Sequence, residues 1–232
     1  MLISGLFHVL KCIVLLIKLK IPDIKIKRFS GSDTSTSSLL EENIAENEDI
    51  RCILLFTPKC RGSTMKKFIN ELRNRENIKE IAIGGGVISH GVKLFQKNNT
   101  KKVFTTNTFY CISFTQNKDK TTQFDAFSLV IPYEHDFKSK LVEFKNHISL
   151  RKSSCAIRIC CVGKDNKDTE TAIFKEVFPA TFIVGLDADG EIGWNKFSSW
   201  QPEEGIPDAK KQKSSHYLWH EFSTVIVILT WG

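Results

Sequence analysis

Hydrophobic and polar positions alternate with two different periods along this chain, and the changes of period outline successive strands and helices. Residues 24–27 alternate isoleucine with lysine as an extended strand does, whereas residues 50–58 form a continuous apolar run that ends at a proline. A run of this kind indicates a strand that is buried on both faces. Residues 63–79 place apolar side chains at helical spacing, and residues 79–86 form a second short apolar segment. We therefore predict a strand–helix–strand unit and a sheet that is at least partly parallel.

The second half of the chain repeats this rhythm. Helical spacing recurs over residues 133–150 and 169–179, and strand-like apolar runs occupy residues 155–163, 182–186 and 223–231. The recurrence predicts an α/β fold of the α+β kind, with mixed sheets and two similar halves of helices and strands. The apolar stripes expected to face the core are Phe137, Leu141, Phe144 and Ile148 in the first helix and Ala172, Ile173, Val177 and Phe178 in the second.

Polar segments separate these elements. The small polar stretch at residues 31–38 predicts a loop, and residues 39–48 after it predict a short amphipathic helix. The extended runs on either side of residues 117–120 are typical of a β-hairpin. The polar, proline-bearing stretch at 194–220 is long for a connection inside a compact domain, so we expect it to be either functional or disordered.

Length, composition and charge are those of a globular protein. The chain has 232 residues, 41% of them hydrophobic, and we expect a first half over residues 1–130, with a linker at 30–48, and a second half over residues 131–232. The net charge of +7 arises from 33 basic and 26 acidic residues that are interleaved along the chain. Because no block concentrates charge of one sign, we expect no nucleic-acid partner.

Cysteine usage and the N-terminal segment bear on the compartment. The seven cysteines show no Cys-x-x-Cys spacing and mostly sit in apolar runs, which is typical of a reducing compartment, the cytoplasm or the nucleus. The apolar segment 2–17 is shorter than the roughly 20 residues that a membrane-spanning helix needs, and it carries Lys11 and His8. No basic region precedes it and no small-residue cleavage site follows it, so it predicts buried strands and no membrane contact.

An apolar strand that ends in Asp187-x-Asp189 raises the question of catalysis. Haloacid dehalogenase-like, Mg²⁺-dependent phosphatases present a nucleophile and an acid in this way. Here Glu191 stands where that pattern has threonine or valine, and too few residues follow for the rest of such a site. Asp189-Gly190 is also a favoured pair for a tight hairpin with positive φ, and we favour that interpretation.

Three other patterns could carry chemistry, but each also fits a purely structural role. Residues 84–86 are three glycines whose backbone N–H groups could bind a phosphate. They match no nucleotide-binding motif, and we favour a turn that the conformational freedom of glycine permits. His216 and His220 have the spacing of metal ligands on a helix but lack the inner glutamate of that motif. A nucleophilic pair of Cys161 with His220 would need spatial closeness that no spacing shows. We expect no catalytic residue, no metal and no cofactor.

Three segments, 156–164, 171–194 and 220–229, resemble in order and spacing the C-terminal FIST domain of the F-box only protein 22 family. Residues 50–60 and 81–89 resemble its first half more loosely. The family pattern has glycine and asparagine where this chain has the two aspartates, which again implies a turn. The matching positions are Cys161, Val162, Gly163, Phe178, Pro179, Gly185, Gly190, Glu191, Ile192, Gly193 and His220.

The resemblance implies a non-enzymatic, protein-binding FIST domain similar to the substrate-recognition part of an SCF-type E3 ubiquitin ligase receptor, which acts in ubiquitin-dependent proteolysis. Its partners would be protein substrates, with ligase components added only if an F-box lies upstream. FIST domains of sensory proteins imply an alternative, the binding of a small ligand. The candidate partner-binding residues, at strand ends expected to lie close together, are Cys161, Gly163, Gly190, Glu191 and Gly193.

Overall fold

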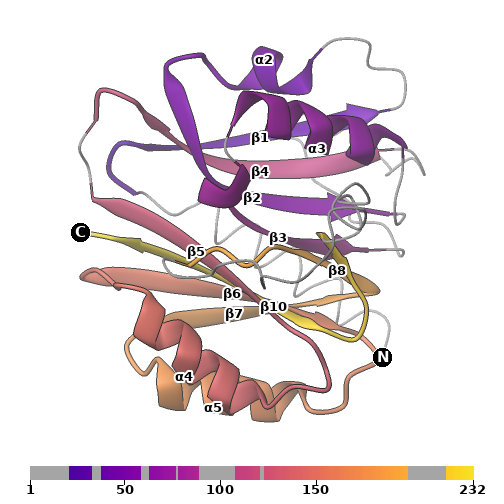
Figure 1. Ribbon diagram of the computed structural model, residues 1–232, viewed down its shortest axis with the longest axis vertical. Helices are drawn as coiled ribbons and strands as arrows, with labels where there is room; N and C mark the ends of the chain where they lie inside the picture. The colour runs from indigo at the N-terminus through magenta and orange to yellow at the C-terminus, as the bar shows by residue number, and fades with distance from the viewer. Residues whose placement is uncertain are drawn as a thin grey trace, which may run out of the picture.

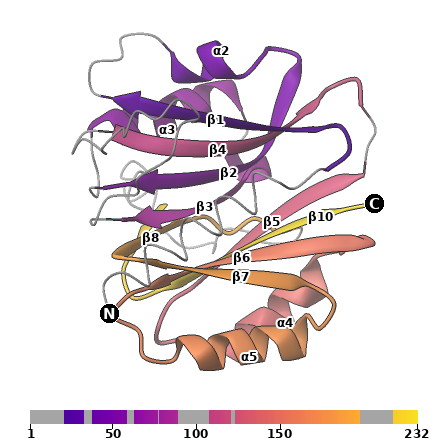
Figure 2. The same cartoon turned by 180° about the vertical axis from the view of Figure 1, so that it is seen from behind.

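Two β-sheets pack face to face in this protein, and helices cover both outer faces, so that the fold has α/β/β/α layers (Figure 1; Figure 2). Among the described residues, no helix has the length and apolar character needed to cross a bilayer. The segment 2–17, His216 and most of the stretch 194–220 lie outside the described part. The computed structural model describes residues 21–32, 38–58, 63–76, 78–88, 108–120, 123–197 and 218–232.

The first sheet has the strand order β1-β4-β2-β3-β8-β9. Only β2 and β3 are parallel, and α3 connects them, so the predicted strand–helix–strand unit is confirmed. The strands are β1 (Ile24–Ser32), β2 (Glu48–Thr57), β3 (Ala82–Val87), β4 (Thr108–Asn117), β8 (Gly190–Gly193) and β9 (Trp219–His220). The outer elements of this sheet are α2 (Leu39–Asn43), α3 (Ser63–Arg75) and the 3₁₀ helix η1 (Ile78–Glu80).

The second sheet has the order β5-β10-β6-β7, in which only β6 and β7 are parallel. Both sheets are therefore mixed, which confirms the predicted fold class at this level. The strands are β5 (Phe124–Ile131), β6 (Ser153–Cys161), β7 (Phe182–Ala188) and β10 (Thr224–Trp231). The helices that cover the sheet are α4 (Phe137–His147) and α5 (Lys167–Val177).

The two halves share one topology. The order β1-β4-β2-β3 arises from the chain order β1-α2-β2-α3-β3-β4, and the order β5-β10-β6-β7 arises from β5-α4-β6-α5-β7-β10 in the same way. The difference is that β8 and β9 lie between β7 and β10 in the chain and extend the first sheet. The sheets divide before Phe124, so β5 belongs to the second sheet and not to the first half expected to end at residue 130.

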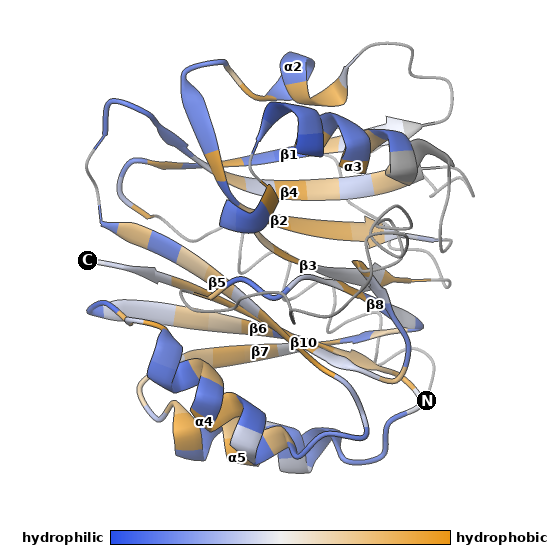
Figure 3. Cartoon of the chain, viewed as in Figure 1, coloured by the Kyte–Doolittle hydropathy of each residue, from blue (hydrophilic) through white to orange (hydrophobic). Residues whose placement is uncertain are grey.

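Three apolar layers hold the sandwich together. The central layer lies between the sheets, where Leu54 and Phe114 of the first sheet meet Ile157 and Val227 of the second. A second layer lies beneath α2 and α3, and a third beneath α4 and α5. Figure 3 shows the apolar colouring on the strands and the polar colouring on the outward parts of the helices. Strands such as β2 are covered on both faces, which explains their unbroken apolar sequence.

The helix α4 follows its predicted pattern. Asp136 caps the helix and accepts hydrogen bonds from the backbone N–H groups of Lys138 and Ser139 at 3.3 and 3.2 Å. The predicted stripe is buried within the helix, and its last member lies just after the helix end. The buried residues are Phe137, Leu141 and Phe144.

The stripe predicted for α5 was partly wrong. Val177 and Phe178 are buried and Ile173 packs against the same core, as expected, but Ala172 is exposed. The face toward the sheet also carries Phe174 and the charged residue Glu170. A charged side chain at a core position is tolerated only when it is paired, and Lys164 supplies that pairing. A prediction of the buried face of this helix from hydrophobicity alone therefore missed the position of Glu170.

Two turn predictions were also wrong. Residues 117–120 do not close a hairpin, because β4 pairs with β1 and β2 whereas β5 pairs with β10 in the other sheet. Residues 84–86 form the middle of β3 and not a turn. A Cβ on Gly84 would lie 2.4 Å from Cγ2 of Val227 across the sandwich, so this glycine permits the sheets to approach closely.

Candidate functional site

The aspartates of the 182–193 segment lie where the chain crosses between the sheets. β7 ends at Ala188 in the second sheet and β8 begins at Gly190 in the first, with Asp189 between them. The backbone N–H of Asp189 donates to the carbonyl of Val87 at 2.8 Å. Neither Asp189 nor Gly190 has positive φ. The predicted tight hairpin was therefore wrong, because the two strands around this segment pair with different sheets.

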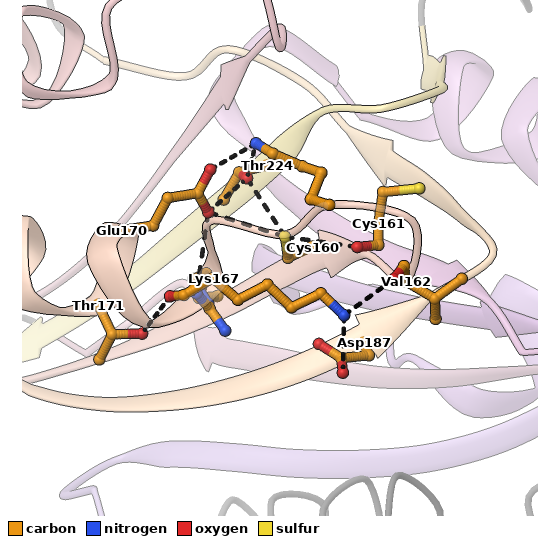
Figure 4. A network of polar contacts seen from close by, with 10 residues as sticks. Cys160, Cys161, Val162, Lys167, Glu170, Thr171, Asp187 and Thr224 are labelled. Carbon is orange, nitrogen blue, oxygen red and sulfur yellow. Dashed lines mark hydrogen bonds and ion pairs between the residues drawn. The ribbon is translucent and has the colours of Figure 1, made fainter. Parts of the chain in front are cut away.

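The two aspartates have different surroundings. Oδ2 of Asp187 lies 3.2 Å from Nζ of Lys167, which also donates to the carbonyl of Val162 at 3.1 Å (Figure 4). Asp189 is exposed on the crossover. Within the ranges that the structure describes, no cluster of three or more histidine, cysteine, aspartate or glutamate side chains has the arrangement of a metal site.

The three segments that resemble the FIST pattern in the second half of the chain meet at this end of the sandwich. Cys161 ends β6 and Glu191 lies in β8, and Ser223 just before β10 joins them. The backbone N–H of Cys161 donates to the carbonyl of Ser223 at 3.4 Å, and the N–H of Ser223 donates to Oε2 of Glu191 at 3.0 Å. The expectation that these strand ends lie close together thus corresponds to contacts in the structure.

The carboxyl group of Glu191 is buried in this junction. The residue has no exposed surface, and its Oε1 atom has no hydrogen-bond partner among the described residues. Burial raises the pKa of Glu191 to about 7, although the N–H of Ser223, the charge of Lys164 and the Cys161 thiol act in the opposite direction. The group therefore changes charge near neutral pH.

A network of buried polar groups lies beside Glu191. Lys164 donates to Oε1 of Glu170 and, at 2.9 Å, to Oγ1 of Thr224. The hydroxyl of Thr224 donates to Oε2 of Glu170, also at 2.9 Å, and the Arg158 guanidinium lies 3.8 Å from the same oxygen. Figure 4 shows Thr224 between Glu170 and Cys160. The charges of this network are thus paired inside the protein.

Sequence reasoning missed this network. Lys164 and Glu170 stand six residues apart across the start of α5, and Thr224 is 54 residues further along, so no local spacing links them. One feature of the sequence could have indicated the network: Glu170 lies on the apolar face of the predicted helix 169–179. A charge on such a face indicates a buried partner.

The cysteines of β6 are poor nucleophiles in this setting. Burial raises the pKa of Cys160 to about 11, so the thiol stays protonated at neutral pH. Cys161 is 6% exposed. His220, the other member of the proposed nucleophilic pair, lies with Nε2 3.2 Å from the carbonyl oxygen of Gly193. The described cysteines are all buried and free, namely Cys52, Cys111, Cys155, Cys160 and Cys161.

The structure separates the five candidate partner-binding residues into two kinds. Gly163 is exposed, whereas Cys161, Gly190, Glu191 and Gly193 are buried. At Gly193 a Cβ would lie 2.8 Å from Cγ2 of both Val130 and Val225, so this glycine permits close packing between the sheets. The buried members shape the surface from beneath and do not reach it.

Exposed apolar side chains surround the turn at Gly163. Tyr133, Val162 and Phe222 are 62%, 50% and 57% exposed. A Cβ on Gly163 would lie 3.4 Å from the Phe222 ring, and Nζ of Lys164 lies 5.6 Å from the centroid of the Tyr133 ring. Large apolar groups that gather on protruding loops are typical of protein contacts.

No family model matches this chain, and no curated protein matches it.

Proposed function

We propose that this chain is a protein-binding domain of the FIST type that captures proteins destined for ubiquitin-dependent degradation in the cytoplasm or nucleus, and that it catalyses no reaction itself. The ligase assignment draws on the sequence resemblance. The repeated topology of the two halves supports a FIST-like arrangement. Ligase components would join only through an F-box located upstream.

One observation carries the protein-binding part of the proposal. Val162 and Phe222 are exposed at the place where the segments that resemble the FIST pattern meet. Interfaces bind through a few exposed apolar or aromatic anchors that stand on a rigid scaffold. Here the scaffold is the buried junction of Cys161, Ser223 and Glu191.

The chemistry near the aspartates supports binding over phosphatase activity. A dehalogenase-like site uses the two aspartates with further acidic metal ligands, and among the described residues no group of three or more such side chains has that arrangement; Asp187 lies in an ion pair with Lys167. The buried network around Glu170 is likewise internally paired. We therefore do not propose the dehalogenase-like hydrolase.

A small-ligand sensor is the second candidate function, and one observation favours it. Oε1 of the buried Glu191 has no hydrogen-bond partner among the described residues, and a ligand N–H or O–H would satisfy it. A panel of amino acids and other small polar metabolites tests this candidate by thermal shift. Stabilisation of the wild type that is absent from Glu191→Gln would support it.

The protein-capture proposal is tested by proximity labelling in cells with the full chain. Val162→Asp places a charge among the exposed apolar groups, whereas Val142→Asp changes an exposed valine of α4 and is the matched control. We expect a set of labelled proteins to be lost with Val162→Asp and kept with Val142→Asp, and the abundance of those proteins to rise when the chain is depleted. An identical labelled set in all three forms would refute the proposal.

A further inference from the structure

The exposed apolar groups at the Gly163 turn form one surface, which we call the tip patch and define as Tyr133, Val162 and Phe222. Phe222 contacts the turn at Gly163, and Val162 is the residue before that glycine. Tyr133 lies over the ammonium group of Lys164, the residue after it. Three separate connections of the chain thus converge on one short turn.

The backbone beneath the tip patch is held by hydrogen bonds. The N–H of Val162 donates to the carbonyl of Ala188 at 2.8 Å, and the N–H of Lys164 donates to the carbonyl of Cys161 at 3.2 Å. Phe222 has a φ of 54°, a conformation that non-glycine residues rarely adopt, and the paired Ser223 follows it. A surface held in this way loses little conformational freedom when it binds.

The surroundings of the tip patch are acidic, although the chain as a whole carries a net charge of +7. Exposed carboxylates stand directly beside the apolar residues: Glu134 follows Tyr133 and Glu221 precedes Phe222. Asp165 is exposed after the turn.

Basic groups near the tip patch are already engaged. The carbonyl of Ala188 accepts the hydrogen bond from the N–H of Val162, and Asp187 and Asp189 stand on either side of this alanine in the sequence. Of these, Asp187 has Lys167 at 3.2 Å. Lys164 is buried and directs its charge to Glu170. His135 also lies near the patch, with Nδ1 3.9 Å from Oε1 of Glu134. Among the described residues, the lysines nearest the patch, Lys164 and Lys167, are thus engaged by Glu170 and Asp187, whereas Glu134, Glu221 and Asp165 present exposed carboxylates beside it.

We propose that the tip patch binds a peptide segment that has an apolar anchor flanked by lysine or arginine. The apolar part follows from the three exposed side chains, and the basic part follows from the carboxylates beside them. Anionic lipid surfaces and nucleic-acid phosphates would be repelled by these carboxylates. The inference rests on the proposed protein-binding function and specifies the chemistry of the partner.

The test is a selection of random peptides of about 12 residues on the full chain, followed by affinity measurements on the synthetic winners. We expect winners with an aromatic or aliphatic anchor and an excess of lysine and arginine. Their affinity should fall at least about tenfold in Glu134→Lys/Glu221→Lys, and as ionic strength rises from about 0.05 M to about 0.5 M. Glu143→Lys, which reverses a charge on α4, is the matched control and should leave it unchanged.

The outcomes separate this inference from the proposed function. Winners that are neutral or acidic, and that lose affinity in Val162→Asp but not in the charge reversal, would overturn the basic-peptide inference and leave protein binding in place. Winners whose affinity depends on neither substitution would overturn the tip patch as a docking surface. Loss of affinity in both variants, with circular dichroism spectra equal to the wild type, supports the inference.

Discussion

The backbone N–H of Ser223 donates a hydrogen bond of 3.0 Å to the carboxyl group of Glu191, and this contact joins the start of β10 in one sheet to β8 in the other. The same serine accepts a hydrogen bond from the N–H of Cys161 at the end of β6. The strand ends that carry the tip patch are thus tied to a carboxyl group with no exposed surface. Its protonation should therefore affect the stability of this junction.

Glu191→Gln tests the charge state of this carboxyl group. Because burial raises its pKa from 4.5 to about 7, folding favours the protonated form, and the resulting stabilisation is present below the unfolded pKa and lost as pH rises through about 7. We expect the free energy of unfolding of the wild type to fall by roughly 3 kcal/mol, relative to the variant, from about pH 4.5 to about pH 7. Denaturant titrations across this range measure the difference, and parallel curves would contradict it.

The buried Lys164–Glu170 pair should behave as a coupled unit. Removing one partner in Glu170→Gln or Lys164→Met unbalances the buried charges, and we expect a loss of about 3–5 kcal/mol of unfolding free energy, smaller for Lys164→Met because Arg158 stays 3.8 Å from Glu170. The double variant Lys164→Met/Glu170→Gln should cost clearly less than the sum of the single variants. A double-mutant cycle by chemical denaturation measures this coupling. Additive losses would show that the pair contributes nothing specific.

Gly84→Ala tests the close approach of the two sheets. The added Cβ would lie 2.4 Å from Cγ2 of Val227, so we expect a loss of about 1–3 kcal/mol in unfolding free energy. Combining it with Val227→Ala removes the clashing methyl group and should recover part of that loss. Gly163→Ala, whose Cβ would have ordinary contact with Phe222 at 3.4 Å, is the control. Equal effects at Gly84 and Gly163 would argue against the inter-sheet explanation.

Phe222→Gly separates stability from binding. Glycine adopts the φ of 54° without strain, so the unfolding free energy should stay equal or rise by about 1 kcal/mol. The same change removes an exposed ring from the tip patch and should weaken capture of the peptides selected above. Thermal unfolding and peptide affinity measured on the same preparation test both parts. A variant that is less stable and binds normally would contradict the assignment.

Local patterns predicted most of the elements, and long-range pairing explains the failures. Continuous apolar runs predicted β2, β6 and β10, because strands covered on both faces need apolar side chains at every position. The segment around residues 117–120 looked like a hairpin because its flanks are extended, but hydrogen bonds to distant strands placed those flanks in different sheets. The predicted hairpin at Asp189-Gly190 was wrong for the same reason, since turn propensity does not determine which sheet each flanking strand joins.

The sequence by itself determined the mixed α/β class and the recurrence of helix and strand in both halves, because periodicity and strand length are local properties of the chain. Only the tertiary structure decided that Glu191 is buried against Ser223, that Lys164 pairs with Glu170, and that Val162 and Phe222 are exposed together. These relations join residues across the sandwich. They depend on which strands pair and how closely the sheets pack, and no local pattern encodes either.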